Sequence, residues 1–338
     1  MLRRALLGSA ALAASAWLAP ASAQRTHPHM ATLRSLLKLP DSGIDFGKVK
    51  LAIDQMADPS LDVAWAGKRL DDMGTMARAM IDHQARMRSL TATDRVDILR
   101  ASLYVPGIWN GHKVFKYDLE NDPSGKAIFA NNLLPVYLRT QRGNCVSMPI
   151  LFVVLAQRLG IDATLATAPQ HLLVKYRSEA GTYGNLECTH DCGPKRDASY
   201  IKEFEISDSA VRNRVYLQPL GKRDVVLAMS GVLGSLYYQK KDVASLHAYA
   251  DLVQEFRPNS LEAVQARTAA YGAALIARYR SKYKRFEDIP AGERDGAREL
   301  LRHIKMLDEK AYALGWRELS PEFETSYQRL VQGALEIK

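Results

Sequence analysis

One apolar run limits the folds that this chain of 338 residues can adopt. The run Ile150–Leu159 carries apolar residues on every face of a helix. Such a helix is stable only when neighbouring elements cover it on all sides. Pro149 fits the first turn of a helix, and Gly160 is the residue type expected just beyond the last turn. The run therefore predicts a buried helix at the centre of a domain, with its start close to Cys145.

Short strands are expected after this helix. Residues 164–167, 171–176 and 183–189 have the pattern of β-strands, and Ser178–Gly181 supplies a hairpin turn between the last two. A buried helix followed by an antiparallel sheet is an α+β arrangement. We therefore expect an α+β fold.

Helices are expected on both sides of this core. In Leu33–Ala101, apolar residues recur at steps of three and four, with a turn at Asp58–Ser60. Proline, glycine and asparagine mark residues 104–132 as a loop-rich connection, and a short helix is expected at Leu133–Arg139. Beyond Gly221 the pattern is helical again.

The first helices after Gly221 follow the spacing of a tetratricopeptide repeat, a helical pair of about 34 residues. Leu233, Gly234 and Tyr237 match its first helix and Pro258 its end, although Leu246 stands where a small residue is usual. Fewer than three such units are rarely stable alone. We therefore expect these helices to pack on the α+β domain.

The N-terminus has the anatomy of a secretory signal peptide. Arg3 and Arg4 precede the uncharged run Ala5–Pro20, and Ala21–Ala23 forms an A-x-A cleavage site. The run is shorter than the roughly 20 residues that a membrane-spanning helix needs, and no later segment is apolar over that length. We expect a periplasmic or secreted protein that begins near Gln24 and has no integral membrane span.

The charge balance does not indicate a nucleic-acid-binding protein. The formal net charge is +9, which favours contact with anionic polymers in general. However, the basic residues are spread along the chain and no aromatic residues interleave with them. The densest basic cluster, residues 278–285, is interpreted as a solvated helical face.

The chain has three cysteines, an odd number that leaves at least one thiol unpaired in an oxidising compartment. Cys188 and Cys192 are close enough in sequence for a disulfide, which leaves Cys145 free. Together with His190 the same pair offers an alternative zinc site, although its spacing matches no standard motif and a fourth ligand is missing. We expect no cofactor and no metal, and the state of the pair stays open.

Cys145, His171 and Glu187 are the candidate catalytic residues. Cys145 stands at the predicted helix start, which Asn144 or Ser147 can cap, and a helix N-terminus favours the thiolate. His171 begins one predicted strand and Glu187 lies in the next, so the two side chains can be neighbours. A thiolate, an imidazole base and an acid that orients the imidazole form a nucleophilic triad.

These motifs resemble the transglutaminase-like superfamily. The resemblance lies in Asn131–Arg142, the turn Arg142–Ser147, the helix end Arg158–Ile161, and the strand segments His171–Val174 and Asn185–Thr189. Within the superfamily the chain is similar to the SirB-type branch, in which this domain is joined to tetratricopeptide helices. The resemblance implies a papain-like domain between helical flanking regions.

The resemblance also implies acyl transfer or amide hydrolysis through a thioester on Cys145, with a protein or peptide as substrate. His171 would relay the proton, Glu187 would hold the imidazole, and the Cys145 amide is a candidate oxyanion donor. The superfamily usually has aspartate at the third position, so Glu187 reaches His171 only if the strands shift slightly. Many SirB-type members have proline in place of the cysteine, and the alternative function is a non-catalytic protein-binding module with a relic triad.

These features divide the chain into four parts. We expect a signal peptide at residues 1–23, a helical N-terminal region at 24–132, a transglutaminase-like core at 133–221 and a helical, tetratricopeptide-like region at 222–338.

Overall fold

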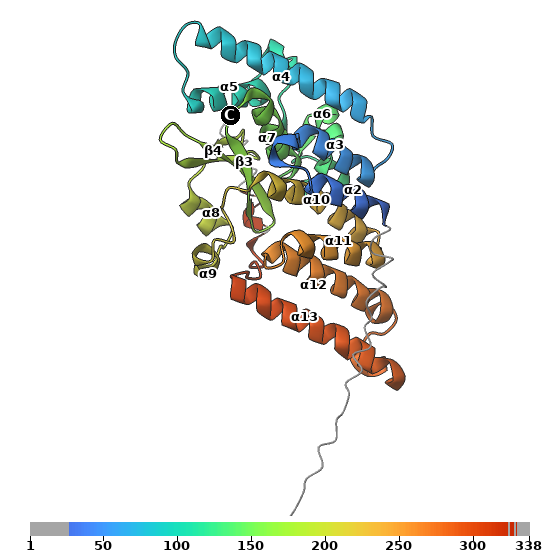
Figure 1. Ribbon diagram of the computed structural model, residues 1–338. Coiled ribbons are helices and arrows are strands. Elements are labelled where there is room, and N and C mark those ends of the chain that lie inside the picture. Colours follow the sequence, from blue (N-terminus) through green and yellow to red (C-terminus); the bar gives the residue numbers. More distant parts are fainter. Residues whose placement is uncertain (1–26, 324, 328, 330–338) are drawn as a thin grey trace, which may run out of the picture.

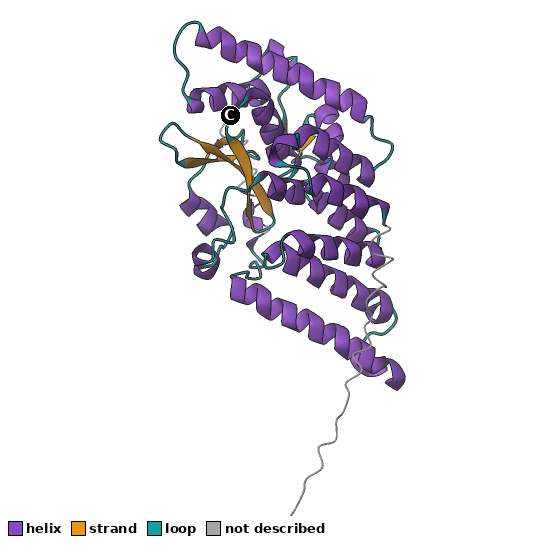
Figure 2. Cartoon of the chain, in the orientation of Figure 1, coloured by secondary structure: helices purple, strands orange, loops and turns teal. Residues whose placement is uncertain are grey.

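The computed structural model describes residues 27–323, 325–327 and 329. The expected signal peptide, residues 1–23, lies outside the described residues. The described chain has the mixed class that the sequence predicts, with a small sheet surrounded by helices (Figure 2).

The central sheet has the strand order β3–β4–β5–β6, and all neighbouring pairs are antiparallel. Its strands are β3 (Ala163–Ala168), β4 (His171–Arg177), β5 (Tyr183–Glu187) and β6 (Gly193–Pro194). The three predicted strands and their hairpin are therefore present. The third strand ends at Glu187 and not at Thr189, because the chain turns there and the His190 amide donates to the Glu187 carbonyl.

Helix α7 (Ser147–Leu159) is the central helix that the apolar run predicts. Its residues Ile150–Ala156 are at most 1% exposed. Helices before it in the chain cover one side, and β3 and β4 cover another. Gly160 follows in the left-handed conformation, with a φ of 70°, as expected for the residue after a helix end.

The N-terminal region is helical, as predicted. Its helices are α2 (Pro28–Leu37), α3 (Phe46–Ala57), α4 (Val63–Ala85) and α5 (Ala92–Tyr104). The expected turn at Asp58–Ser60 separates α3 from α4. Residues 38–45 and 86–91 add two interruptions that the periodicity does not predict. Pro40 cannot donate a helical hydrogen bond, and Thr91 caps a new helix, so these local signals override the apolar pattern.

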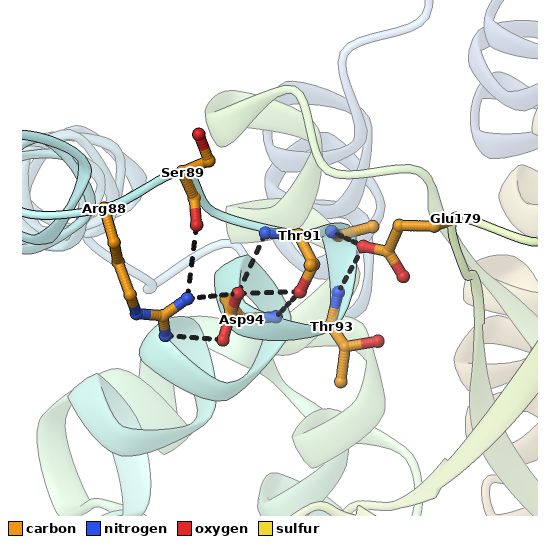
Figure 3. Close-up of polar contacts among 7 residues, drawn as sticks. Arg88, Ser89, Thr91, Thr93, Asp94 and Glu179 are labelled. Atoms are coloured by element: carbon orange, nitrogen blue, oxygen red, sulfur yellow. Dashed lines mark hydrogen bonds and ion pairs between the residues drawn. The ribbon is translucent and has the colours of Figure 1, made fainter.

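The start of α5 is tied to the turn of the β4–β5 hairpin (Figure 3). Thr91 and Asp94 form a capping box, and Arg88 makes two hydrogen bonds of 2.7 Å to the Asp94 carboxylate. These hydrogen bonds lower the pKa of Asp94, and the bonds from Arg88 have a larger effect than those from Thr91. Glu179 of the hairpin turn accepts hydrogen bonds from two amides in the first turn of α5. The N-terminal helices and the sheet are therefore joined by polar contacts as well as by packing.

A buried ion pair fixes the segment that leads to Cys145. The ammonium of Lys50 lies 2.6 Å from the carboxylate of Asp54, and neither side chain is exposed. Lys50 also donates to the carbonyl of Asn132 at 3.1 Å, and Asp54 accepts the amide of Leu134 at 2.7 Å. The pair on α3 thereby sets the start of α6 (Leu134–Thr140), close to the helix that Leu133–Arg139 predicts. Buried charges are tolerated when paired and hydrogen-bonded in this way.

Two short strands complete the approach to Cys145. Strand β1 (Lys116–Tyr117) pairs in parallel with β2 (Arg142–Gly143), so the expected loop-rich stretch is partly ordered against the motif that precedes the cysteine. Short 3₁₀ and π segments lie at Asp41–Gly43, Ile108–Asn110, Phe129–Asn132, Ile276–Arg280, Phe286–Asp288 and Ala291–Glu293.

The C-terminal region is helical. After α8 (Asp197–Glu203) and α9 (Asp208–Arg212) come α10 (Lys222–Gln239), α11 (Val243–Phe256), α12 (Leu261–Leu275) and α13 (Arg294–Leu314). The last four helices are stacked one after another, with α10 nearest the sheet and α13 farthest from it (Figure 1). Helix α10 packs against α3 and β3, so this region rests on the α+β domain as expected.

Among the described helices, none combines the length and the apolar character that crossing a bilayer requires.

Candidate functional site

Cys145 lies in the turn between β2 and α7, and Asn144 holds that turn in place. The side-chain oxygen of Asn144 accepts two amides at the start of α7, at 3.0 and 3.2 Å. Its side-chain nitrogen donates to the carbonyl of Gly125 at 3.0 Å and to the side chain of Asn132 at 2.9 Å. Neither predicted capping residue occupies the N-cap position, which is Val146; Asn144 holds the turn just before it, and Ser147 is the first residue of the helix.

His171 and Glu187 lie at the same end of β4 and β5, since the register places Val174 opposite Leu186. Nε2 of His171 is 2.9 Å from Oε2 of Glu187, and the side chains are only 1% and 9% exposed. The second oxygen of Glu187 accepts the amide and the hydroxyl of Thr189, at 3.1 and 2.7 Å. Glutamate therefore reaches the imidazole despite its extra methylene group.

Cys145 lies beside the residue that begins β4. Its Sγ is 3.9 Å from the carbonyl oxygen of Gln170, and no hydrogen bond of standard geometry joins Sγ to His171. Nδ1 of His171, the nitrogen that Glu187 does not use, is buried and has no hydrogen-bond partner among the described residues. Cys145 is nevertheless close enough to influence His171 electrostatically. The structure thus brings the three predicted residues together and leaves Nδ1 available.

The charges of the pair shift both of its pKa values. Burial alone would lower the pKa of His171, but the Glu187 carboxylate and the Cys145 thiol outweigh burial and raise it to about 9. Burial alone would raise the pKa of Glu187, but the charge and hydrogen bond of His171, with a smaller effect of Lys195, lower it to about 2. Near neutral pH the two side chains therefore form an imidazolium–carboxylate ion pair.

Aromatic side chains that no sequence motif marks enclose this pair. The ring centroid of Phe204 lies 4.7 Å from that of His171, and the ring of Tyr200 lies 6.3 Å away. Both come from α8 and its C-terminal end. Lys195 places its ammonium 4.7 Å from the Tyr200 ring centroid. Thr189 had a sequence signal, since it closes the Asn185–Thr189 motif, but the aromatic pair had none.

Cys145 opens onto a cavity of about 270 Å³. Gln170, Lys126, Gln239 and Phe204 are among the residues that line it. A second cavity, of about 470 Å³, is lined by Glu187 and the loop that follows β5. The cavity at Cys145 gives the thiol access to a ligand.

Cys188 follows Glu187 directly, Cys192 lies in the same loop, and both are fully buried. Their Sγ atoms are 2.8 Å apart, and the two residues are free thiols in this structure. His190 between them is exposed, and the described residues contain no group of three or more side chains able to hold a metal ion. Nothing in the described chain therefore supports the alternative zinc site.

Comparison with known proteins identifies a domain in this part of the chain. The model of the transglutaminase-like superfamily matches residues 65–231, from α4 into α10. Cys145, His171 and Glu187 all lie within the matched range. No curated protein and no solved structure matches the chain.

We expect Glu187→Gln to lower the pKa of His171 well below about 9, because a neutral amide removes the charge that opposes burial. An NMR titration of the His171 ring measures this, and a His190→Ala variant provides a matched control with an exposed histidine removed. A His171 pKa that stays near its wild-type value in Glu187→Gln would contradict the assignment of Glu187 as its partner.

The same pair sets the direction of a pH effect on stability. The pKa of His171 is raised from 6.5 to about 9. Its contribution to the free energy of unfolding is therefore complete below pH 6.5 and is lost as the pH rises through about 9. The pKa of Glu187 is lowered from 4.5 to about 2. Its contribution to the free energy of unfolding is therefore present above pH 4.5 and is lost as the pH falls toward 2. Urea unfolding at a series of pH values should show both losses in the wild type, and Glu187→Gln should show a weaker alkaline loss.

We expect Cys188 and Cys192 to form a disulfide under oxidising conditions. Their sulfur atoms are already in contact, and a bond length of about 2.05 Å requires only a small approach. Non-reducing peptide mapping after mild oxidation should recover the two cysteines in one bridged peptide, with Cys145 still open to alkylation. Recovery of both as free thiols after the oxidised chain is denatured would exclude the bridge.

Proposed function

We propose that the transglutaminase-like domain at residues 65–231 carries out thiol-dependent acyl transfer or amide hydrolysis, with Cys145 as nucleophile. The observation that carries this proposal is the buried His171–Glu187 pair, joined at 2.9 Å, beside a cysteine that lines a cavity. A transglutaminase-like domain is compatible with thiol-dependent catalysis. The His171 imidazolium next to Cys145 also favours the thiolate form of the cysteine.

In the first half of the proposed reaction, the Cys145 sulfur attacks a carbonyl carbon of the substrate. The thiol proton is held by His171, whose free Nδ1 is the nitrogen available for it. The Cys145 amide has no acceptor among the described residues and is the candidate donor to the oxyanion. The carbon–nitrogen bond then breaks, His171 gives its proton to the leaving amine, and a thioester remains on Cys145.

In the second half, water or an amine attacks the thioester. His171 takes a proton from the attacking group, the carbon–sulfur bond breaks, and the proton returns to the sulfur. Glu187 keeps the imidazole in one orientation throughout and balances its positive charge. Water gives hydrolysis and an amine gives transfer, and a protein or peptide amide is the proposed substrate in both.

The alternative function, a binding module with a relic triad, is not favoured. A buried ion pair costs free energy when its charges leave water, and a relic site has no use for one. Here the pair is intact, and further hydrogen bonds from Thr189 hold its carboxylate.

We also propose the closer relationship to the SirB-type branch with tetratricopeptide-like helices. It is supported by the motif segments around Cys145 and by the packing of α10 against α11. There the Cα of Gly234 faces the ring of Tyr249 so closely that an added Cβ would lie 2.8 Å from it. A small residue in the first helix of a pair is the feature that the repeat spacing predicts.

If Cys145 is the nucleophile, Cys145→Ala should abolish turnover. We expect His171→Ala to reduce it by about 10²-fold or more, because the proton relay is lost. Suitable assays are ammonia release from glutamine-containing peptides and hydroxamate formation with hydroxylamine. His83→Ala, which removes an exposed histidine on α4, is the matched control and should leave turnover unchanged.

The rate of Cys145 alkylation by iodoacetamide against pH provides a measurement that needs no substrate. His171→Ala should slow labelling near neutral pH, and Glu187→Gln should slow it less, since the imidazole remains. Labelling that follows an ordinary thiol pKa of about 8.5 in the wild type and in both variants would show that no thiolate–imidazolium pair exists. The enzyme proposal would then fall.

Export is a proposal that rests on residues 1–23 alone. The expected mature N-terminus is Gln24 or a neighbour within a residue or two. Mass spectrometry of the protein isolated from its native host would measure it. An abundant form that still begins at Met1 would contradict export through a cleaved signal.

A further inference from the structure

The chain returns to the candidate site after its last long helix. Residues 316–323 and 325–327, here called the C-terminal strap, follow α13 and lead back toward the sheet (Figure 1). The strap ends at Phe323 and Tyr327, which lie one helical turn apart, and an amide–carbonyl bond from Ser326 to Glu322 marks that turn as helical.

The beginning of the strap is fixed to α9. Gly315 has a φ of 118°, which favours glycine, and a Cβ at this position would lie 2.3 Å from the backbone nitrogen of Ala210. The Ser207 hydroxyl donates to the Gly315 carbonyl at 2.6 Å. Asn213 donates to the carbonyl of Leu314 at 2.9 Å. The direction in which the strap leaves α13 is therefore set by close contacts.

A second attachment lies at the middle of the strap and is exposed. Glu205 accepts the Ser320 amide at 2.8 Å and the Ser320 hydroxyl at 2.6 Å. Exposed hydrogen bonds exchange readily with water, so this attachment can open without disturbing the core.

The end of the strap covers the triad. Phe323 and Tyr327 are 6% and 8% exposed. The ring centroid of Tyr327 lies 6.1 Å from that of His171 and 6.1 Å from that of Phe204, and the Phe323 ring lies 5.9 Å from Phe204. The aromatic cover over the His171–Glu187 pair therefore has two sources, α8 with its C-terminal end and the strap.

Tyr327 also separates two cavities. It lines the cavity that contains Cys145 and the one that contains Glu187 and Thr189, and Phe204 is the other residue common to both. A substrate chain that extends from the Cys145 cavity into the Glu187 cavity has to pass the position of Tyr327.

We propose that the C-terminal strap is an autoinhibitory segment, which has to leave the triad before a polypeptide substrate can cross the site. The inference rests on the proposed function, since it takes Cys145 as the nucleophile. Release begins at the exposed Ser320–Glu205 contact, while the attachment at Gly315 stays closed and keeps the strap nearby. The chain thereby carries its own reversible block.

The test compares how fast Cys145 in the full chain is alkylated by a small reagent, iodoacetamide, and by a bulky one, a fluorescein maleimide. Labelling is quantified on the Cys145 peptide by mass spectrometry. This separates its label from any label on the two other thiols, Cys188 and Cys192. The ratio of the bulky to the small rate is the readout, since a change in thiol reactivity affects both rates and cancels. Tyr327→Ala should raise this ratio by about tenfold or more if the strap limits access.

Glu205→Ala weakens the exposed attachment without touching the core and should raise the ratio by a smaller factor. Glu322→Ala removes an exposed side chain of the strap and is the matched control, expected to leave the ratio unchanged. Circular dichroism checks the fold of each variant, and Glu205→Ala decides the question if Tyr327→Ala does not fold.

An unchanged ratio in the folded variants would overturn the inference. Its failure is distinguishable from failure of the proposed function. Access to the thiol is measured without turnover. A raised ratio in Tyr327→Ala together with a wild-type pH profile of labelling in His171→Ala would therefore support the strap as a barrier and contradict the proposed role of His171 in catalysis.

Discussion

The buried ion pair between His171 and Glu187 is the interaction on which the candidate site depends. Two charges removed from water are stable only when their geometry is held closely, and several elements here do so. The β4–β5 register brings the two side chains to one end of the hairpin, and Thr189 fixes the carboxylate. The Glu179 contact with α5 anchors the other end of the same hairpin. The hairpin that carries the pair is therefore held at both of its ends.

Much of this arrangement can be predicted from the sequence because it depends on local patterns. An apolar run without a polar face, ended by Gly160, leaves α7 no place except the core. Strand composition and a short turn predict the hairpin, and the hairpin in turn makes His171 and Glu187 neighbours. The family match at residues 65–231 agrees with the motifs around Cys145. The boundaries expected at residues 23, 132 and 221 stay predictions.

The remainder depends on contacts between segments that are distant in sequence. Phe204 and Tyr327 carry no motif, and their positions follow from how α8 and the strap pack on the sheet. The interruptions in the N-terminal helices come from Pro40 and from the Thr91 cap, which apolar periodicity does not register. The direction of the Cys145 thiol, toward the carbonyl of Gln170, is a side-chain conformation that the order of residues does not encode.

The hydrogen bonds of Asn144 have a consequence for how this domain can vary in length. Its side chain joins the start of α7 to Gly125 and to Asn132, two points in the loop before α6. Both points have to arrive at the same amide group, so the number of residues between them cannot change freely. Surface loops usually accept insertions, but one added residue here would displace the Asn144 turn that precedes α7. Variation in loop length should therefore be found elsewhere in the fold, and this stretch should keep its length wherever the thiol is retained.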